Sequence, residues 1–172
     1  MPTARQWIET LGLEPHMEGG YFRRTFQADH RPPLHTARGE RHLLTSIHYL
    51  LTKDSPVGHW HLNQSDILHF HHSGAPLDYH LIHPDGRAET VTLGPDPYQG
   101  HVLTLAVPGG LWKATHLGDG DHALISEAVA PGFDYADMTL GQPDDLTARF
   151  PQHVALIRRY CRPPSTGDTH LT

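Results

Sequence analysis

The chain has 172 residues and a mass of 19.2 kDa, the size of one domain with a sizeable core. Its 13 Lys and Arg against 19 Asp and Glu give a net charge of −6 with histidine neutral, which argues against a nucleic-acid partner. The single cysteine, Cys161, excludes an internal disulfide framework and a cysteine zinc finger. The sequence has no apolar run near the roughly 20 residues that span a bilayer, and no apolar secretory segment at its start. We therefore expect a cytoplasmic protein with no membrane partner.

The first element predicted along the chain is a short amphipathic helix over residues 3–11. Thr3 is a suitable N-cap and Gly12 a suitable stop. From residue 21 to residue 129, short apolar or alternating segments are separated by Gly-rich and Pro-rich turns, which is typical of an all-β sandwich or barrel. The predicted strands are 21–27, 43–51, 65–73, 77–83, 88–93, 102–107, 113–117 and 123–129. The turn Pro84-Asp85-Gly86 predicts a hairpin between two of them.

The last element predicted is a C-terminal helical segment over residues 144–160. Leu146, Phe150, Val154 and Ile157 recur there at helical spacing. Pro151 falls inside this pattern, where a proline ends or begins a helix. We treat residues 1–172 as a single domain.

Histidine is the unusual residue of this composition, with 17 copies. The densest group comprises His59, His61, His69, His71 and His72, with a carboxylate among them at Asp66. Two histidines at i and i+2 on a strand point to the same face, so His59 and His61 could bind one ion. With Asp66 as a third group, this is a ligand set for Zn²⁺, Fe²⁺, Mn²⁺ or Ni²⁺. For any single histidine, however, an exposed position without a role is the simpler interpretation.

Five blocks of the sequence stand in order along most of the chain. They are Leu13-Glu14-Pro15-His16-Met17-Glu18-Gly19-Gly20-Tyr21-Phe22-Arg23, Thr45-Ser46-Ile47-His48-Tyr49-Leu50-Leu51, Trp60-His61 with Asp66 and Gly74-Ala75-Pro76-Leu77, Val107-Pro108-Gly109-Gly110-Leu111-Trp112, and Val129-Ala130-Pro131-Gly132-Phe133-Asp134. The spacing of His59, His61, Asp66 and Gly74 resembles the first motif of the cupin superfamily to within one residue. Together the five blocks resemble, within that superfamily, the small cupin-5 family of unknown function.

This resemblance implies an all-β fold, namely a single cupin barrel, or double-stranded β-helix (jelly roll), over about residues 20–130 with short flanking helices. It also implies a homodimer. The sequence departs from the family at Ile67, where the family has Glu, and at Lys113, where a metal-binding cupin has histidine. Because an ammonium repels a cation, a bound divalent metal is one expectation and no cofactor is the other.

The resemblance also implies a site for a small molecule in the barrel mouth. We expect catalytic groups at His61, Asp66, Lys113 and His48, a set suited to proton abstraction next to a carbonyl, as in sugar isomerases and epimerases. If a metal is present, His59, His61 and Asp66 are its expected ligands. We expect ligand contacts from Tyr21, Arg23, His71 and Trp112. For Tyr21 and Trp112, burial in the core is the competing interpretation. The competing function is a non-catalytic module that binds an anionic ligand near Lys113, which could pair with Asp66.

Overall fold

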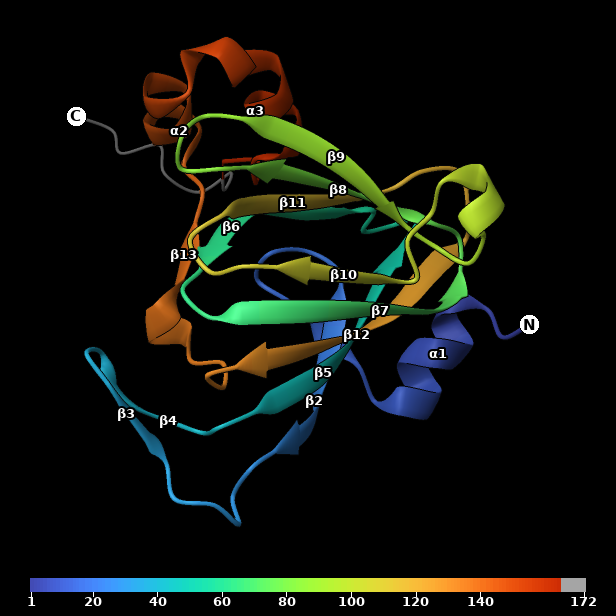
Figure 1. Ribbon diagram of the computed structural model, residues 1–172. Coiled ribbons are helices and arrows are strands. Elements are labelled where there is room, and N and C mark those ends of the chain that lie inside the picture. The colour runs from blue at the N-terminus through green and yellow to red at the C-terminus, as the bar shows by residue number, and fades with distance from the viewer. Residues whose placement is uncertain (165–172) are drawn as a thin grey trace, which may run out of the picture.

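The computed structural model describes residues 1–164 and shows two antiparallel sheets folded against each other as a barrel (Figure 1). In the six-stranded sheet the strand order is β1-β2-β5-β12-β7-β10, and in the five-stranded sheet it is β13-β6-β11-β8-β9. The first sheet comprises β1 (Glu14–Pro15), β2 (Tyr21–Gln27), β5 (Thr45–Thr52), β7 (Asp66–Gly74), β10 (Thr104–Val107) and β12 (His122–Ala130). The second comprises β6 (Val57–Asn63), β8 (Leu77–Ile82), β9 (Ala88–Leu93), β11 (Trp112–Leu117) and β13 (Met138–Leu140). The predicted all-β cupin barrel is confirmed.

Alternate residues of both sheets point into the barrel. At one end of the barrel these inward residues are apolar and form a packed core. Its fully buried members include Tyr49, Leu51, Tyr79 and Ile125. The predicted hairpin is present, with β8 and β9 paired from Leu77↔Leu93 to Ile82↔Ala88. This packed end leaves the other end of the barrel for polar side chains.

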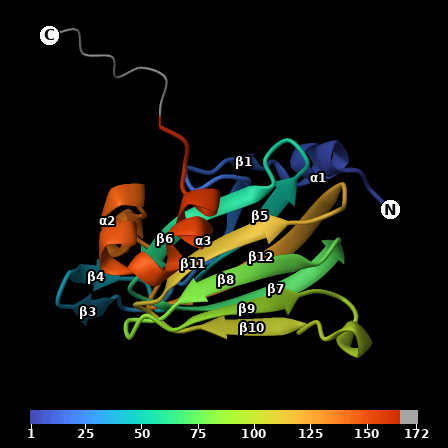
Figure 2. The same ribbon diagram turned by 90° about the horizontal axis from the view of Figure 1, so that it is seen from above.

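Helices cover two outer faces of the barrel (Figure 2). The predicted N-terminal helix is α1 (Ala4–Leu11), with Thr3 as N-cap and Gly12 as a left-handed C-cap. It packs Trp7, Ile8 and Leu11 against the outer side of β5. The predicted C-terminal helical segment is interrupted at Pro151, which removes a backbone donor, and forms α2 (Pro143–Arg149), the 3₁₀ turn η3 (Pro151–His153) and α3 (Val154–Tyr160). Residues 165–172 lie outside the described part of the chain.

A two-stranded arm that the sequence patterns did not predict extends from the barrel, formed by β3 (Leu34–Thr36) and β4 (Gly39–Arg41) (Figure 1). Two further 3₁₀ turns are η1 (Pro97–Gln99) and η2 (Tyr135–Asp137). Asp137 in η2 accepts from Arg41 Nε at 2.8 Å and from Arg38 Nε at 2.7 Å. Both Arg41 and Asp137 are buried, so this paired charge group ties the arm to the segment that follows β12.

The loop between β1 and β2 lies across the edge of the five-stranded sheet, where its backbone is held by the barrel. The Tyr49 hydroxyl donates to the Gly19 carbonyl at 2.8 Å, and the His59 amide donates to the Glu18 carbonyl at 2.6 Å. Gly19 has φ +99°, and a Cβ added there would lie 2.1 Å from the carbonyl oxygen of Val57. Glycine is therefore required at this position for both its conformation and its size.

We predict that Gly19→Ala destabilises the fold more than the matched change Gly100→Ala. Gly100 has a similar φ of +82°, but an added Cβ there meets nothing within 4 Å. Gly100→Ala should cost only the left-handed backbone penalty of about 1–2 kcal/mol. Gly19→Ala should cost clearly more, because backbone atoms must also move. Denaturant unfolding measures both losses, and equal losses would contradict the close approach.

Candidate functional site

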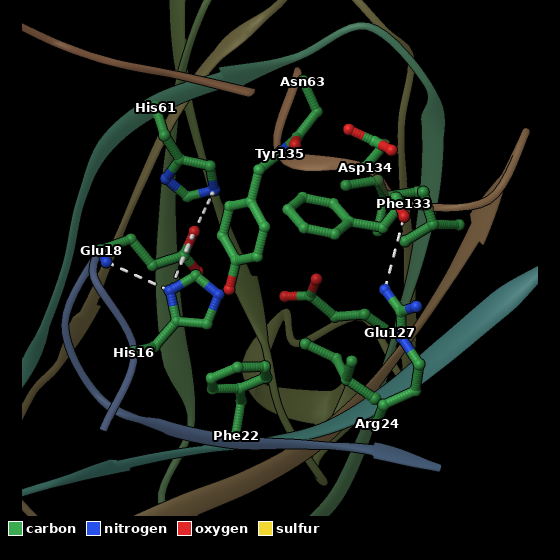
Figure 3. A pocket seen from close by; sticks show the side chains of 13 residues that line it. His16, Glu18, Phe22, Arg24, His61, Asn63, Glu127, Phe133, Asp134 and Tyr135 are labelled. Atoms are coloured by element: carbon green, nitrogen blue, oxygen red, sulfur yellow. Dashed lines mark hydrogen bonds and ion pairs between the residues drawn. The ribbon is translucent and has the colours of Figure 1, made fainter. Parts of the chain in front are cut away.

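One mouth of the barrel holds a cavity of about 380 Å³, which is the size of a small-ligand site. Its polar wall carries two histidines, two carboxyl groups and an amide, and its apolar wall carries aromatic and branched side chains (Figure 3). The polar members that the argument uses are His16, Glu18, His61, Asn63 and Glu127. The apolar members are Phe22, Ile47, Ile67, Val129, Phe133 and Tyr135; Arg24 and Asp134 complete the lining.

A hydrogen bond joins His61 and Glu18 at the polar wall. His61 Nδ1 lies 2.7 Å from the His59 carbonyl oxygen, which can only accept, so Nδ1 carries a hydrogen. His61 Nε2 lies 3.1 Å from Glu18 Oε2. Burial, reinforced by the Lys113 charge, lowers the pKa of His61 to about 3, so its ring is neutral at pH 7. Nε2 is then an acceptor, and Glu18 must be a carboxylic acid that donates to it.

The pKa of Glu18 agrees with this assignment. Burial and the neighbouring charge of Glu127 raise the pKa of Glu18 to about 8. His16, beside it, accepts from the Glu18 amide through Nδ1 at 3.1 Å, so the hydrogen of its neutral ring is on Nε2. Burial lowers the pKa of His16 to about 4. At neutral pH, Glu18, His16 and His61 thus form an uncharged group.

A buried ionic chain runs from Lys113 through His69 to Glu127. Lys113 Nζ lies 3.2 Å from His69 Nε2, and an ammonium can only donate, so Nε2 accepts. His69 Nδ1 therefore carries the hydrogen and lies 3.3 Å from Glu127 Oε1. The Tyr79 hydroxyl lies 3.2 Å from the same nitrogen. Burial, then Lys113, lowers the pKa of His69 to about 4, so the ring is neutral at pH 7.

Glu127 is the one carboxylate of the cavity that is held in the ionised form by buried groups. Burial alone would raise its pKa, but the His69 ring and the Lys113 ammonium outweigh burial and keep the pKa of Glu127 well below its usual range. Figure 3 shows its carboxyl group directed toward the middle of the pocket. On its polar wall the cavity therefore presents one protonated carboxyl group, Glu18, and one carboxylate, Glu127.

Asn63 adds an unpaired polar group to the cavity. The residue is 9% exposed, and its Oδ1 is buried without a hydrogen-bond partner among the described residues. Buried amides normally find partners, so this atom is available to a bound molecule. Because a side-chain amide carries both a carbonyl oxygen and an NH₂ group, Asn63 can present either an acceptor or a donor to such a molecule.

The structure brings together only some of the predicted site residues. His61 and Lys113 are directly opposite each other on β6 and β11, and both point inward. On β7 the inward residues are Ile67 and His69, which leaves Asp66 on the outer side, where its carboxylate accepts from the Gly109 amide at 2.8 Å. Lys113 therefore pairs with the His69–Glu127 group rather than with Asp66.

A β-bulge separates His59 from His61. Between the pairs Lys113↔His61 and Thr115↔Gly58, β6 has one residue more than β11, so the alternation of β6 is broken at this point. The His59 ring bonds instead to the Tyr160 carbonyl at 3.2 Å, in the C-terminal helical layer. The expectation that His59 and His61 share a face is thus corrected.

The remaining predicted site residues lie outside the cavity. His48 is on the outer side of β5, with its ring 6.2 Å from that of His72. Tyr21 packs under α1, and Trp112 packs under the C-terminal helices, as the competing core interpretation held. Arg23 is exposed beside Gly12, and His71 bonds to the Ala75 carbonyl at 3.0 Å.

Sequence reasoning left His16, Glu18, Asn63 and Glu127 unassigned. The signal for the first two was present, because both belong to the block that ends in Gly19-Gly20-Tyr21-Phe22-Arg23. Phe133 and Asp134 likewise end the Val129–Asp134 block. Nothing local marks Asn63 or Glu127, whose roles depend on strand orientation.

The expected metal ligands do not form a site in this arrangement. Within residues 1–164, no three or more His, Cys, Asp or Glu side chains are arranged to hold a metal ion. His59 and Asp66 point away from His61, and the ammonium of Lys113 lies among the inward groups. The described chain also has no helix long and apolar enough to span a bilayer.

Comparison with known proteins identifies relatives of the whole barrel. The chain is 36% identical over 154 residues to an uncharacterized protein of Saccharomyces cerevisiae, covering 82% of this chain and 76% of that protein. A hypothetical protein from Leishmania major matches with a TM-score of 0.86 and 32% identity, over 94% of this chain and 100% of that one. A Shewanella oneidensis protein matches with a TM-score of 0.86 and 31% identity, over 95% and 99% of the two chains.

A more distant match supports the fold alone. Oxalate decarboxylase of Bacillus subtilis aligns with a TM-score of 0.54 and 15% identity, over 85% of this chain and 36% of that one. A family profile described as Cupin superfamily (DUF985), Cupin_5, matches residues 5–141. The chain therefore belongs to the Cupin_5 family of the cupin superfamily.

Proposed function

We propose that this protein binds a small, sugar-like molecule in the barrel mouth and moves a proton on it, as in an isomerase or epimerase. The observation that carries this proposal is the opposite state of two carboxyl groups on one cavity. Glu18 is hydrogen-bonded as an acid to His61, and Glu127 is held as a carboxylate by His69 and Lys113. Environments that shift the pKa values of two neighbouring carboxyl groups in opposite directions are typical of catalytic acid–base pairs.

In the proposed reaction, Glu127 removes a proton from the carbon next to a carbonyl group. Glu18 donates its proton to the carbonyl oxygen as the enol forms, and the neutral His16 Nε2–H is a further donor at that oxygen. For an isomer, the other hydroxyl group of the enediol returns a proton to Glu18, and protonated Glu127 gives its proton to the former carbonyl carbon. For an epimer, the enol oxygen returns its proton to Glu18, water delivers a proton to the opposite face of the same carbon, and Glu127 releases its proton to solvent. His61 and His69 act as positioning residues, because each fixes the protonation state of one carboxyl group.

The shape of the cavity supports a ligand with one polar and one apolar face. The C–H face of a sugar ring suits aromatic walls such as Phe22, Phe133 and Tyr135. Its hydroxyl groups would meet Asn63 and the carboxyl groups. Arg24, whose Nη2 lies 3.4 Å from the Phe133 carbonyl at the rim, would face an anionic substituent on such a ligand.

The alternative is a binding module without catalysis. The unpaired Asn63 amide favours it, since a hydrogen-bonding group of this kind gives affinity and specificity without chemistry. In that case the cavity binds ligand and leaves every carbon–hydrogen bond of the ligand intact.

Proton exchange with solvent distinguishes the two functions. Aldoses, ketoses and α-hydroxy ketones are each incubated with the protein in D₂O, and ¹H NMR follows the hydrogen next to the carbonyl group. We predict that at least one of these compounds exchanges this hydrogen for deuterium. Glu127→Gln and Glu18→Gln should each lower the exchange rate by about 10²–10⁴-fold, the usual contribution of one acid or base. Lys53→Ala, at an exposed turn, is the control. Binding with no exchange would support the module instead.

The pH dependence of stability tests the state of Glu18 without a substrate. Because the pKa of Glu18 is raised in the folded state from the ordinary glutamate value of 4.5 to about 8, neutral Glu18 contributes stability that is complete below pH 4.5 and is lost as the pH rises through about 8. We predict that Glu18→Gln, which keeps a donor to His61 but cannot ionise, gains stability relative to wild type between about pH 5 and pH 9. Denaturant unfolding measures the difference, with the exposed Glu14→Gln as control. A constant difference would contradict a protonated Glu18.

We also propose that the protein is a homodimer. The outer side of β7 and β12 exposes Leu68, which is 43% accessible and pairs with Ala128, while α1 covers this face only at the end that holds Leu124. A second copy would bury this face. Light scattering at micromolar concentration should give twice the chain mass of 19.2 kDa, and the mass of one chain would contradict the dimer.

A further inference from the structure

The backbone of the bulge in β6 holds both members of the Glu18–His61 pair. Between the ladder pairs that β6 makes with β11, His59 and Trp60 lie opposite Ala114 alone. A bulge leaves its extra residue unpaired in the ladder, so the backbone groups of His59 are free to bond elsewhere. The His59 amide donates to the Glu18 carbonyl at 2.6 Å, and the His59 carbonyl accepts from His61 Nδ1 at 2.7 Å. One residue thus fixes the backbone of the first member and the ring of the second.

The side chains of the two bulge residues bind the end of α3. The His59 ring lies with Nδ1 3.2 Å from the Tyr160 carbonyl oxygen, and the Trp60 indole donates to the Ile157 carbonyl at 3.1 Å. A carbonyl oxygen can only accept, so His59 Nδ1 carries the hydrogen of that ring. The Tyr160 carbonyl is among the last of the helix, which have no donor within it. The C-terminal helix and the bulge therefore hold each other.

We propose that His59 is a positioning residue for the acid of this site and that α3 holds it in place. This inference rests on the acid role proposed above for Glu18. The His59 carbonyl keeps the hydrogen of the His61 ring on Nδ1, and only then does Nε2 accept the Glu18 proton over 3.1 Å. With its hydrogen on Nε2, His61 would be a second donor toward Glu18, and the protonated carboxyl group would lose its acceptor.

The C-terminal helices support the acid without lining the cavity, since no lining residue belongs to α2, η3 or α3. The bulge has no ladder partner to hold it, so loss of the His59 donor would let the His59 carbonyl turn away from His61. Glu127 is held by His69 and Lys113, which lie on β7 and β11. The effect should therefore be confined to the acid and leave the base as it is.

The tautomer of His61 tests this inference without a substrate. Long-range ¹H–¹⁵N NMR spectra of protein labelled with ¹⁵N-histidine distinguish a hydrogen on Nδ1 from one on Nε2, and the His61 signals are identified by their loss in His61→Gln. Wild type should show the hydrogen on Nδ1. His59→Phe, which fills the space of the ring without a donor, should populate the Nε2–H form. It should also lower the D₂O exchange rate by about 10²-fold, the cost of a displacement near 1 Å.

Two variants serve as matched comparisons. His59→Asn should restore both the tautomer and the exchange rate, because its amide can donate to the Tyr160 carbonyl as the ring does. His116→Ala is the control for a general loosening of the C-terminal helices. The His116 ring lies 5.5 Å from the Tyr160 ring and makes no hydrogen bond to Tyr160 within residues 1–164. His116→Ala should leave the His61 tautomer unchanged.

An unchanged Nδ1–H tautomer in folded His59→Phe would overturn the inference, and so would the same change of tautomer in His116→Ala. If His59→Phe does not fold, His59→Ala replaces it and is judged by the same result. The outcome is separate from that of the proposed reaction. Exchange in wild type with an unchanged tautomer in His59→Phe leaves the proton transfer standing and removes the role of His59. A changed tautomer with no exchanging sugar supports the role of His59 in the pair and counts against the reaction.

Discussion

A lysine ammonium inside a β-barrel is the constraint on which the site depends. A buried charge is tolerated only with partners, and Lys113 has His69 and, through it, Glu127. This arrangement fixes the tautomer of His69 and the ionisation of Glu127. Burial, reinforced by the negative charge of Glu127, raises the pKa of Glu18, which completes the pair of opposite carboxyl groups on the cavity. The ionised carboxylate of the site thus follows from one side chain on β11, whereas the protonated carboxyl group follows mainly from burial.

The barrel was predictable because its signals are local or repeated. Turn residues such as Pro84-Asp85-Gly86 mark strand ends, and the strands predicted at 21–27 and 88–93 have the observed bounds. The segment around Pro151 shows where apolar spacing misleads. The helical spacing of apolar residues continues from α2 to α3, but Pro151 has no backbone N–H and a 3₁₀ turn interrupts the helix there. The β3–β4 arm lacked any apolar alternation, because it does not pack into the core.

The site was less predictable because it depends on which way strands face. Strict alternation places His59 beside His61, but a bulge that no sequence pattern marks turns His59 toward Tyr160. The alternation of β7 was correct, yet only tertiary structure shows that Ile67 and His69, not Asp66, are inside. Glu18 reaches the cavity because Gly19 allows the loop to cross the sheet edge, an arrangement that residue spacing alone does not encode.

The buried pair between Arg41 and Asp137 has a consequence for how this barrel can diversify. It joins the β3–β4 arm to the stretch whose Phe133, Asp134 and Tyr135 form part of the cavity wall. No residue of β3 or β4 lines the ligand cavity, so substitutions in the arm do not change the groups that would contact a ligand. Changes in its length or rigidity would reposition the aromatic wall while leaving the acid and the base in place. A segment outside the cavity is thus mechanically joined to the aromatic wall of the cavity, and not to the elements that carry its two glutamates.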